Sequence, residues 1–131
     1  MADPIGQAFE IHVVGDETLE TFTGKFRAKE KLSWSDQLNI DRVRRELLGV
    51  NAAEANVDVY RRATVIAELS VYLTETPDFW KTSRGGLDLI DDNVVMKVYD
   101  EAIAVREKWV KAQKEKGEKA RAALAEQQGK K

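Results

Sequence analysis

The stretch AEANVDVYRRATVIAELSVYL, from Ala53 to Leu73, decides the fold. At helical spacing its apolar residues form two neighbouring stripes, which predicts one long helix. The first stripe contains Val57, Tyr60, Ala63 or Thr64, Ala67 and Val71, and the second contains Val59, Ile66, Leu69 and Leu73. The polar positions leave a narrow wetted face made of Asp58, Arg61, Arg62, Glu68 and Ser70. We therefore expect the other elements to pack around this helix.

A β-hairpin is predicted ahead of this helix. Apolar and polar residues alternate from Phe9 to Val14, and a turn follows at residues 15–17. A second alternating run, from Leu19 to Phe26, suits a returning strand. Gly24 lies between two phenylalanines and indicates a bulge or a close backbone approach. Because two strands alone are marginal in water, the hairpin is expected to lie on the helices or to join a sheet in a partner.

Two further helices are predicted. One starts with Ser33 or Ser35 as its N-cap, carries Asp36 in its first turn and stops at Gly49. Its expected buried side contains Leu38, Val43, Leu47 and Leu48. The other helix begins near Asn93, and its lengthwise seam contains Val95, Val98, Ala102, Val105 and Trp109. For Asp91 and Asp92 we favour N-capping over metal binding, because the Asp88, Asp91 and Asp92 group lacks the spacing of a calcium loop.

The predicted fold class is therefore α+β and mainly α. An N-terminal β-hairpin leads into a small bundle of about three main helices, and a long C-terminal helix projects as a charged tail. Residues 1–8 form an irregular arm, residues 9–110 form a single hairpin-plus-helical domain, and residues 111–131 form a charged tail that is helical or disordered.

Charge is distributed unevenly along the 131 residues. The net charge is −2, but residues 111–131 hold seven Lys or Arg against three Glu, so this tail carries +4 and the remainder −6. A basic tail is able to contact nucleic acid or an acidic partner, but we favour a solvated helix or a frayed end. The arginines of the RVRR run, Arg42, Arg44 and Arg45, suit the carbonyl end of their helix. Nucleic acid is therefore not the expected partner.

The sequence offers little catalytic chemistry. Cysteine is absent and His12 is the only histidine, so no thiolate metal site is available and nothing indicates a nucleophilic triad. We expect no enzyme activity, no cofactor and no metal. The chain also lacks an apolar run of about 18 residues and a signal-peptide pattern, so no membrane contact is expected and the chain is most simply cytoplasmic.

Aromatic residues are the candidate protein-binding residues. Phe79 and Trp80 stand side by side and are not expected to face one core together, so one of them is a candidate anchor for a partner. The alternative, that both plug the end of the helical core, stays open. The hairpin edge is a second candidate surface, and self-association of the chain is possible. The candidate partner-binding residues are Phe22, Phe26, Phe79, Trp80 and Trp109.

Four motifs in this order resemble the tail assembly chaperones of long-tailed bacteriophages. They are TFTGKF (Thr21 to Phe26), AEL (Ala67 to Leu69), PDFW (Pro77 to Trp80) and VYDE (Val98 to Glu101). The resemblance covers about residues 9–110, and its motifs are loose. The hairpin departs from it, being more strongly patterned than a purely helical member of that group needs.

The resemblance implies a non-enzymatic assembly factor of the host cytoplasm that coats the tape measure protein and recruits tail tube subunits. Such proteins commonly have a longer, frameshifted form, and Gly129-Lys130-Lys131 is compatible with a slippery codon run. One rival class is a structural virion protein, such as a capsid decoration or head-tail joining subunit. A third class is a nucleic-acid-binding accessory protein that uses the RVRR run and the basic tail.

Overall fold

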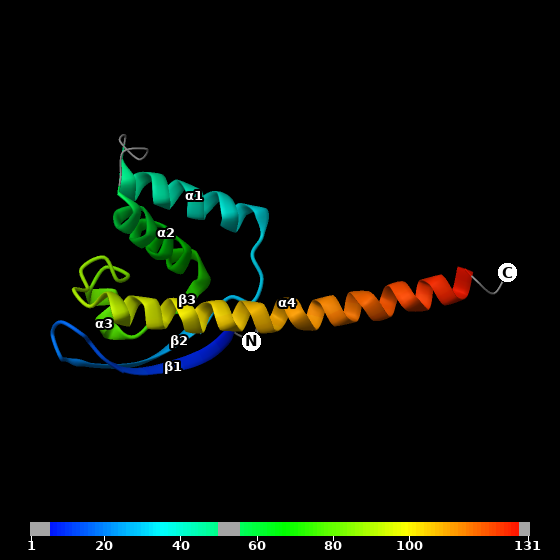
Figure 1. Cartoon of the computed structure of the whole chain (residues 1–131), viewed down its shortest axis with the longest axis horizontal. Coiled ribbons are helices and arrows are strands. Elements are labelled where there is room, and N and C mark those ends of the chain that lie inside the picture. Colours follow the sequence, from blue (N-terminus) through cyan, green and yellow to red (C-terminus); the bar gives the residue numbers. More distant parts are fainter. Residues whose placement is uncertain (1–5, 50–55, 129–131) are drawn as a thin grey trace.

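The computed structural model describes residues 6–49 and 56–128. A sheet lies beneath a layer of helices, and one long helix runs out of this body (Figure 1). The elements in chain order are β1 (Gln7–Val14), β2 (Thr21–Ala28), α1 (Trp34–Leu48), α2 (Val57–Tyr72), β3 (Leu73–Glu75), α3 (Asp78–Thr82) and α4 (Asp92–Gln128). The predicted mainly helical α+β fold, with its N-terminal hairpin and projecting C-terminal helix, is confirmed.

The described residues form a three-stranded sheet in the order β1-β2-β3. Strands β1 and β2 are antiparallel, with a register that runs from Gln7 opposite Ala28 to Val14 opposite Thr21. Strand β3 pairs with the end of β2 and was not predicted, because Leu73 was assigned to the central helix. The expected close approach at Gly24 is confirmed, since a Cβ atom there would lie 2.5 Å from Cγ of Pro77.

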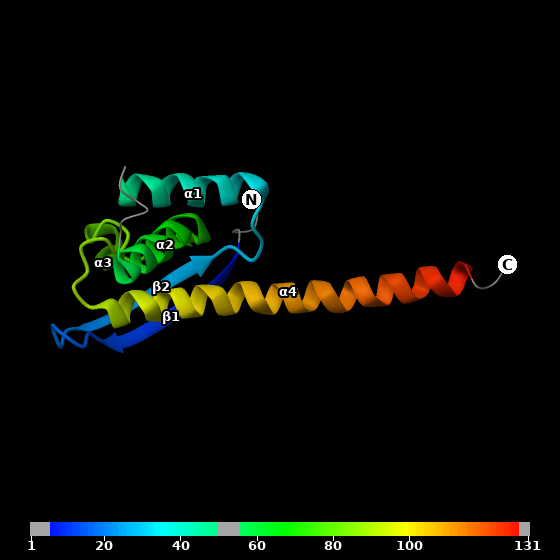
Figure 2. The ribbon, with the colours of Figure 1, turned by 45° about the horizontal axis from the view of Figure 1, so that its top comes forward.

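The core lies between one face of the sheet and helices α2 and α4 (Figure 2). Strand alternation turns Ile11, Phe26 and Ala28 toward the helices, while residues such as His12 and Lys25 face away. The buried apolar residues that meet there are Ile11, Phe26, Ala28, Val65, Ile66, Leu69, Tyr72, Trp80, Val94, Val95, Val98 and Ala102. The hairpin is therefore stabilised by packing on the helices of its own chain.

Helix α2 is shorter and less covered than the Ala53–Leu73 stretch predicted. It begins at Val57, where the Asn56 side chain accepts a hydrogen bond of 2.9 Å from the N–H of Val59; residues 53–55 lie outside the described part. The second half, from Ala63 to Tyr72, contains all the buried residues of α2. The prediction of cover on most sides is wrong for the first turn, because Val57 and Tyr60 stay exposed although Arg44 of α1 lies over the Tyr60 ring.

Helix α1 has the predicted ends but not the predicted burial. Ser33 and Asp36 form a reciprocal capping box, and Gly49 is the C-cap. No residue of α1 is buried, and Leu38 is 52% exposed, so the predicted buried side is wrong for Leu38, Val43, Leu47 and Leu48. The reason is that α1 is the outermost layer and packs mainly on α2 (Figure 1).

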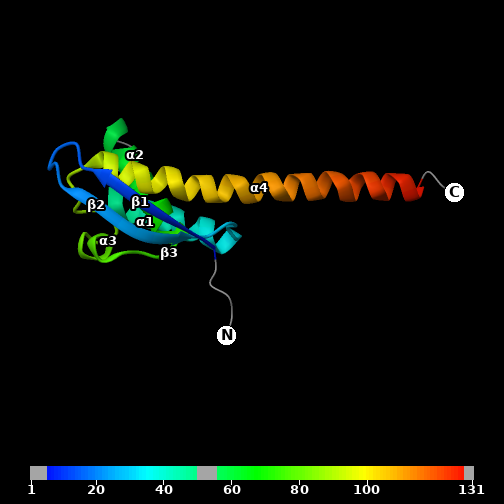
Figure 3. The ribbon, with the colours of Figure 1, turned by 90° about the horizontal axis from the view of Figure 1, so that it is seen from below.

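Helix α4 is the longest element, with 37 residues. Its first turns lie on the sheet, and its later turns continue far beyond the body (Figure 3). The predicted start near Asn93 is one residue late, and the tail is helical from residue 111 to Gln128; residues 129–131 lie outside the described part. At the other end, β1 takes in Gln7 and Ala8, the last two residues of the predicted arm.

Candidate functional site

Four of the five predicted site residues meet in one aromatic cluster under α3. Ring centroids are 5.3 Å apart for Phe22 and Phe79, and 5.6 Å apart for Phe26 and Trp80. Phe79 and Trp80 contact each other edge to face at 6.4 Å, and both rings contact Phe26. The prediction that these two residues do not face one core is therefore wrong. The reason is that α3 is a short helix laid along β2, so that neighbouring positions both reach the strand.

The five predicted partner-binding residues differ in how much of their surface a partner could reach. Phe26 is 0% exposed and Trp80 is 4% exposed, so they give a partner no surface in this fold. Phe22 and Phe79 are partly buried at the edge of the cluster. Trp109 lies apart from them on α4, over residues 7 and 8 of β1. Binding of a partner by these five residues stays a prediction.

A buried carboxylate, Asp91, ties the start of α4 to the turn between β1 and β2. It is 1% exposed and accepts hydrogen bonds from the N–H groups of Glu17 and Thr18, at 2.7 and 3.0 Å. The Thr18 hydroxyl donates a third, at 2.6 Å, and this bond is the main reason that the pKa of Asp91 lies below its ordinary value of 3.8. A Cβ atom at position 15 would lie 2.2 Å from Oδ2 of Asp91, so any other residue there would have to displace this carboxylate.

The predicted capping role of Asp91 is correct only for its backbone. Its carbonyl oxygen accepts the N–H of Val94 at 3.1 Å, in the manner of an N-cap residue, but its side chain binds the distant turn. Asp92 does not cap either, because its carboxylate binds two arginines of α2. Sequence reasoning missed both contacts, since the partners lie far away along the chain.

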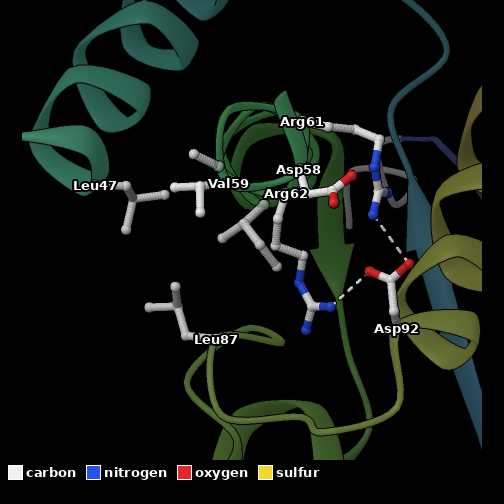
Figure 4. A pocket seen from close by; sticks show the side chains of 9 residues that line it. Leu47, Asp58, Val59, Arg61, Arg62, Leu87 and Asp92 are labelled. Atoms are coloured by element: carbon white, nitrogen blue, oxygen red, sulfur yellow. Dashed lines mark hydrogen bonds and ion pairs between the residues drawn. The ribbon is translucent and has the colours of Figure 1, made fainter. Parts of the chain in front are cut away.

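The candidate binding site is a groove between the end of α1, the start of α2 and the loop after α3 (Figure 4). Its volume is about 390 Å³. The apolar side chains that line it are Leu47, Val59, Ala63, Ile66 and Leu87. Leu47, Val59 and Leu87 are at least partly open to solvent, with Val59 51% exposed. This combination of an apolar lining and an open mouth suits the side chains of another protein.

Three of the four charged side chains that line this groove, Arg61, Arg62 and Asp92, are paired with one another, and Asp58 is the fourth. Asp92 contacts Arg61 at 3.1 Å and Arg62 at 2.7 Å, as the dashed lines in Figure 4 mark. Arg62 also donates to the carbonyl oxygens of Gly86 and Leu89, at 3.1 and 2.9 Å. These two arginines were predicted to lie on a wetted face, but they join α2 to the loop and to α4. The groove therefore presents apolar surface and no free cation to a ligand.

Other ionisable groups hold the fold together. The arginines of the RVRR run contact carboxylates of their own helix, Arg44 and Arg45 to Asp41 and Arg42 to Glu46. His12 shares a hydrogen bond of 2.8 Å with Thr23 across the hairpin. Within the described ranges, no three His, Cys, Asp or Glu residues are grouped so that they could hold a metal ion.

One partly buried polar pair joins α2 to α4. The Tyr99 hydroxyl donates a hydrogen bond to the Glu68 carboxylate. Burial, together with the charge and hydrogen bond of Glu68, raises the pKa of Tyr99. A tyrosine whose pKa is raised keeps its proton at neutral pH, so this pair is a structural contact.

None of the described helices combines the length and apolar character needed to cross a bilayer.

Comparison of the chain with protein-family models, with curated proteins and with solved structures found no match. The function of the protein therefore has to be inferred from its own residues and contacts.

Proposed function

We propose that this chain is a non-enzymatic bacteriophage morphogenesis protein, a tail assembly chaperone that binds the tape measure protein and recruits tail tube subunits. It would act in the host cytoplasm during assembly. The motifs TFTGKF, AEL, PDFW and VYDE, which resemble those of this family, support the proposal. The helices and the final long helix follow the order of these motifs, whereas the hairpin is the part that departs from the resemblance.

The observation that carries the proposal is the apolar groove in Figure 4. A protein that holds a helical client needs exposed apolar surface into which client side chains can insert. Leu47, Val59 and Leu87 provide this surface from three different elements. Because Arg61 and Arg62 are already paired with Asp92, the groove favours apolar side chains over charged small molecules.

The test is co-expression with the tape measure protein of the same phage, followed by purification. We expect the two proteins to purify together, and we expect the variants Val59→Lys and Leu87→Lys to weaken binding about tenfold, because each buries a charge in the contact. Leu38→Lys is the matched control, since Leu38 is an exposed leucine of α1 outside the groove. Equal binding by all three variants would contradict the groove as the client site.

The alternative function is that of a structural virion protein, either a capsid decoration or a head-tail joining subunit. The projecting part of α4 favours it, since a long charged helix is able to reach a neighbouring subunit in a particle. Mass spectrometry of purified particles separates the two functions. A chaperone should be missing from them, whereas a structural protein should be present at high copy number.

Nucleic-acid binding is less well supported than either protein-binding function. The described arginines of the RVRR run have carboxylate partners, so their charge is largely neutralised. Residues 111–131 keep a net charge of +4. DNA binding that weakens steeply with added salt would favour this third function.

A further inference from the structure

Strand β1 is an edge of the sheet, and no other described strand pairs with its outer side. The N–H of Gly15 donates to the carbonyl oxygen of Glu20 at 2.9 Å, so Gly15 and Glu20 form a hydrogen-bonded pair. This fixes which of the following residue pairs along the hairpin are hydrogen-bonded and which are not. In an antiparallel pair, residues point their backbone groups alternately toward and away from the partner. With the register unbroken, the residues whose N–H and C=O groups point outward are Ala8, Glu10, His12 and Val14.

A side-chain contact agrees with this alternation. The Asn93 amide donates to the outward carbonyl oxygen of Val14 at 2.9 Å, which ends the open edge near the turn. Among the described residues, no hydrogen bond reaches the outward N–H groups of Ala8, Glu10 and His12. The open edge therefore runs along the first two thirds of β1. Such an edge pairs readily with another extended chain unless something covers it.

Helix α4 passes beside this edge. It crosses the sheet at an angle and continues past β1 (Figure 3). In its apolar seam, Val95 and Val98 are 0% exposed, whereas Val105 and Trp109 are only partly buried. These last two residues line a groove of about 580 Å³ together with Gln7 and Ala8 of β1, and much of the remaining lining is charged, with Glu30, Glu101, Lys108 and Lys116. Val105 and Trp109 are therefore the large apolar side chains of α4 beside the place where a fourth strand would lie.

We propose that the open edge of β1 takes up one extended segment of another protein, which adds a fourth strand to the sheet beneath α4. The outward backbone groups of Ala8, Glu10 and His12 would bind its main chain, and Val105 and Trp109 would cover its apolar side chains. A strand alternates its side chains, so the segment should be apolar at every second residue. The inference holds whether the chain is a chaperone or a virion protein.

The occupant is a single segment and not β1 of a second copy. In an antiparallel continuous sheet, a second β1 would bring its own α4 onto the same side of the sheet. The first α4 already passes over that side of the free edge (Figure 3). The outward N–H and C=O groups of β1, with α4 beside them, therefore leave room for one extended segment but not for a second copy of the whole chain.

The experiment selects binders to the full chain from a display library of random octapeptides and measures the affinity of the enriched peptides. We expect enrichment of peptides with apolar residues at alternate positions. Glu10→Pro removes an outward N–H and should weaken binding about tenfold, whereas Glu10→Ala keeps this group and should bind normally. Trp109→Ala should weaken binding similarly, and Leu124→Ala, an exposed leucine of the same helix, should not.

Amide hydrogen exchange locates the bound peptide and does not depend on any variant. With a selected peptide bound, the amides of Ala8, Glu10 and His12 should exchange at least tenfold more slowly, while those of Phe9 and Ile11, which already face β2, serve as internal references. Enrichment of peptides with helical spacing, binding that survives Glu10→Pro, or no enrichment would overturn the proposal. So would a wild-type dimer that Glu10→Pro converts to a monomer. Absence of tape measure binding would leave this result untouched, so the two proposals fail separately.

Discussion

The two halves of α4 are one continuous helix with opposite surroundings. From Asp92 to Ala102 the helix lies on the sheet and on α2, and Val94, Val95 and Val98 are 0% exposed. From Val110 to Gln128 every residue except Gln113 and Gly117 is exposed, including Leu124 at 57%. The first half is therefore held by packing, while the second half depends on helix propensity alone.

This difference shows which part of the α4 sequence determines the fold. In the first half, the apolar seam selects the helix, its register and its partners at once. In the second half, residues such as Ala120, Arg121 and Leu124 favour a helix but select no partner within the chain. An isolated helical stretch of this length is marginal in water, so it is the natural place for order to change when another molecule binds.

The largest difference in the free energy of unfolding is expected between matched valine substitutions in the two halves of α4. Val98→Ala should lower the free energy of unfolding by about 2 kcal/mol, because it removes buried methyl groups and leaves a cavity. Val110→Ala should change it by less than about 0.5 kcal/mol, because Val110 is 47% exposed. Urea unfolding at neutral pH measures both. Equal losses would mean that the projecting half is part of the cooperative core.

Local patterns of the sequence were enough for the hairpin, for the three main helices and for part of the packing, but not for β3 and α3. The capping box of Ser33 and Asp36, the stop at Gly49 and the seam through Val95 and Val98 depend on neighbours within one turn or two. Such patterns are readable because propensity and periodicity act over a few residues. Strand β3 was missed because its three residues carry no period of their own and are ordered by pairing with β2.

The candidate site was harder to predict, because its residues come together only in the fold. An exposed valine such as Val59 has the same sequence signature as a buried one, so the groove it forms with Leu47 and Leu87 has no signal in the sequence. The aromatic residues gave a signal, but Phe26 and Trp80 form core and not surface. Asp91 was assigned to its own helix, because its partners Glu17 and Thr18 are more than seventy positions away.

A smaller loss of thermal stability is expected for a substitution at Asp91, just before the packed half of α4 begins. Asp91→Asn should lower the thermal midpoint by roughly 3 to 5 °C, because the neutral amide loses charge-assisted hydrogen bonds from the turn. Asp88→Asn is the matched control, since Asp88 is an exposed aspartate that pairs with Arg84. A loss of the same size in both variants would indicate a general charge effect.

The pH dependence of this difference has a definite sign. The pKa of Asp91 lies below 3.8 in the folded chain and returns to its ordinary value on unfolding. The unfolded state therefore binds the proton more readily, so the stabilisation is complete above about pH 5 and disappears as the pH falls through the folded pKa. Thermal midpoints of wild type and Asp91→Asn should converge in acid. A gap that stays constant down to pH 2 would exclude the carboxylate as its source.

The smallest effect is expected in the projecting half, at Gly117. Alanine there adds about 1 kcal/mol of local helix propensity, and apart from the adjoining residues and the backbone of its own helix its Cβ atom would have no described atom within 4 Å. Gly117→Ala should therefore slow amide exchange around residues 111–128 several-fold, by hydrogen exchange with mass spectrometry, and leave the thermal midpoint of the body unchanged. A midpoint that rises by several degrees would mean that the projecting half unfolds together with the core. If exchange slows alone, the two halves are thermodynamically separate, and binding of another molecule can order the projecting half without changing the stability of the body.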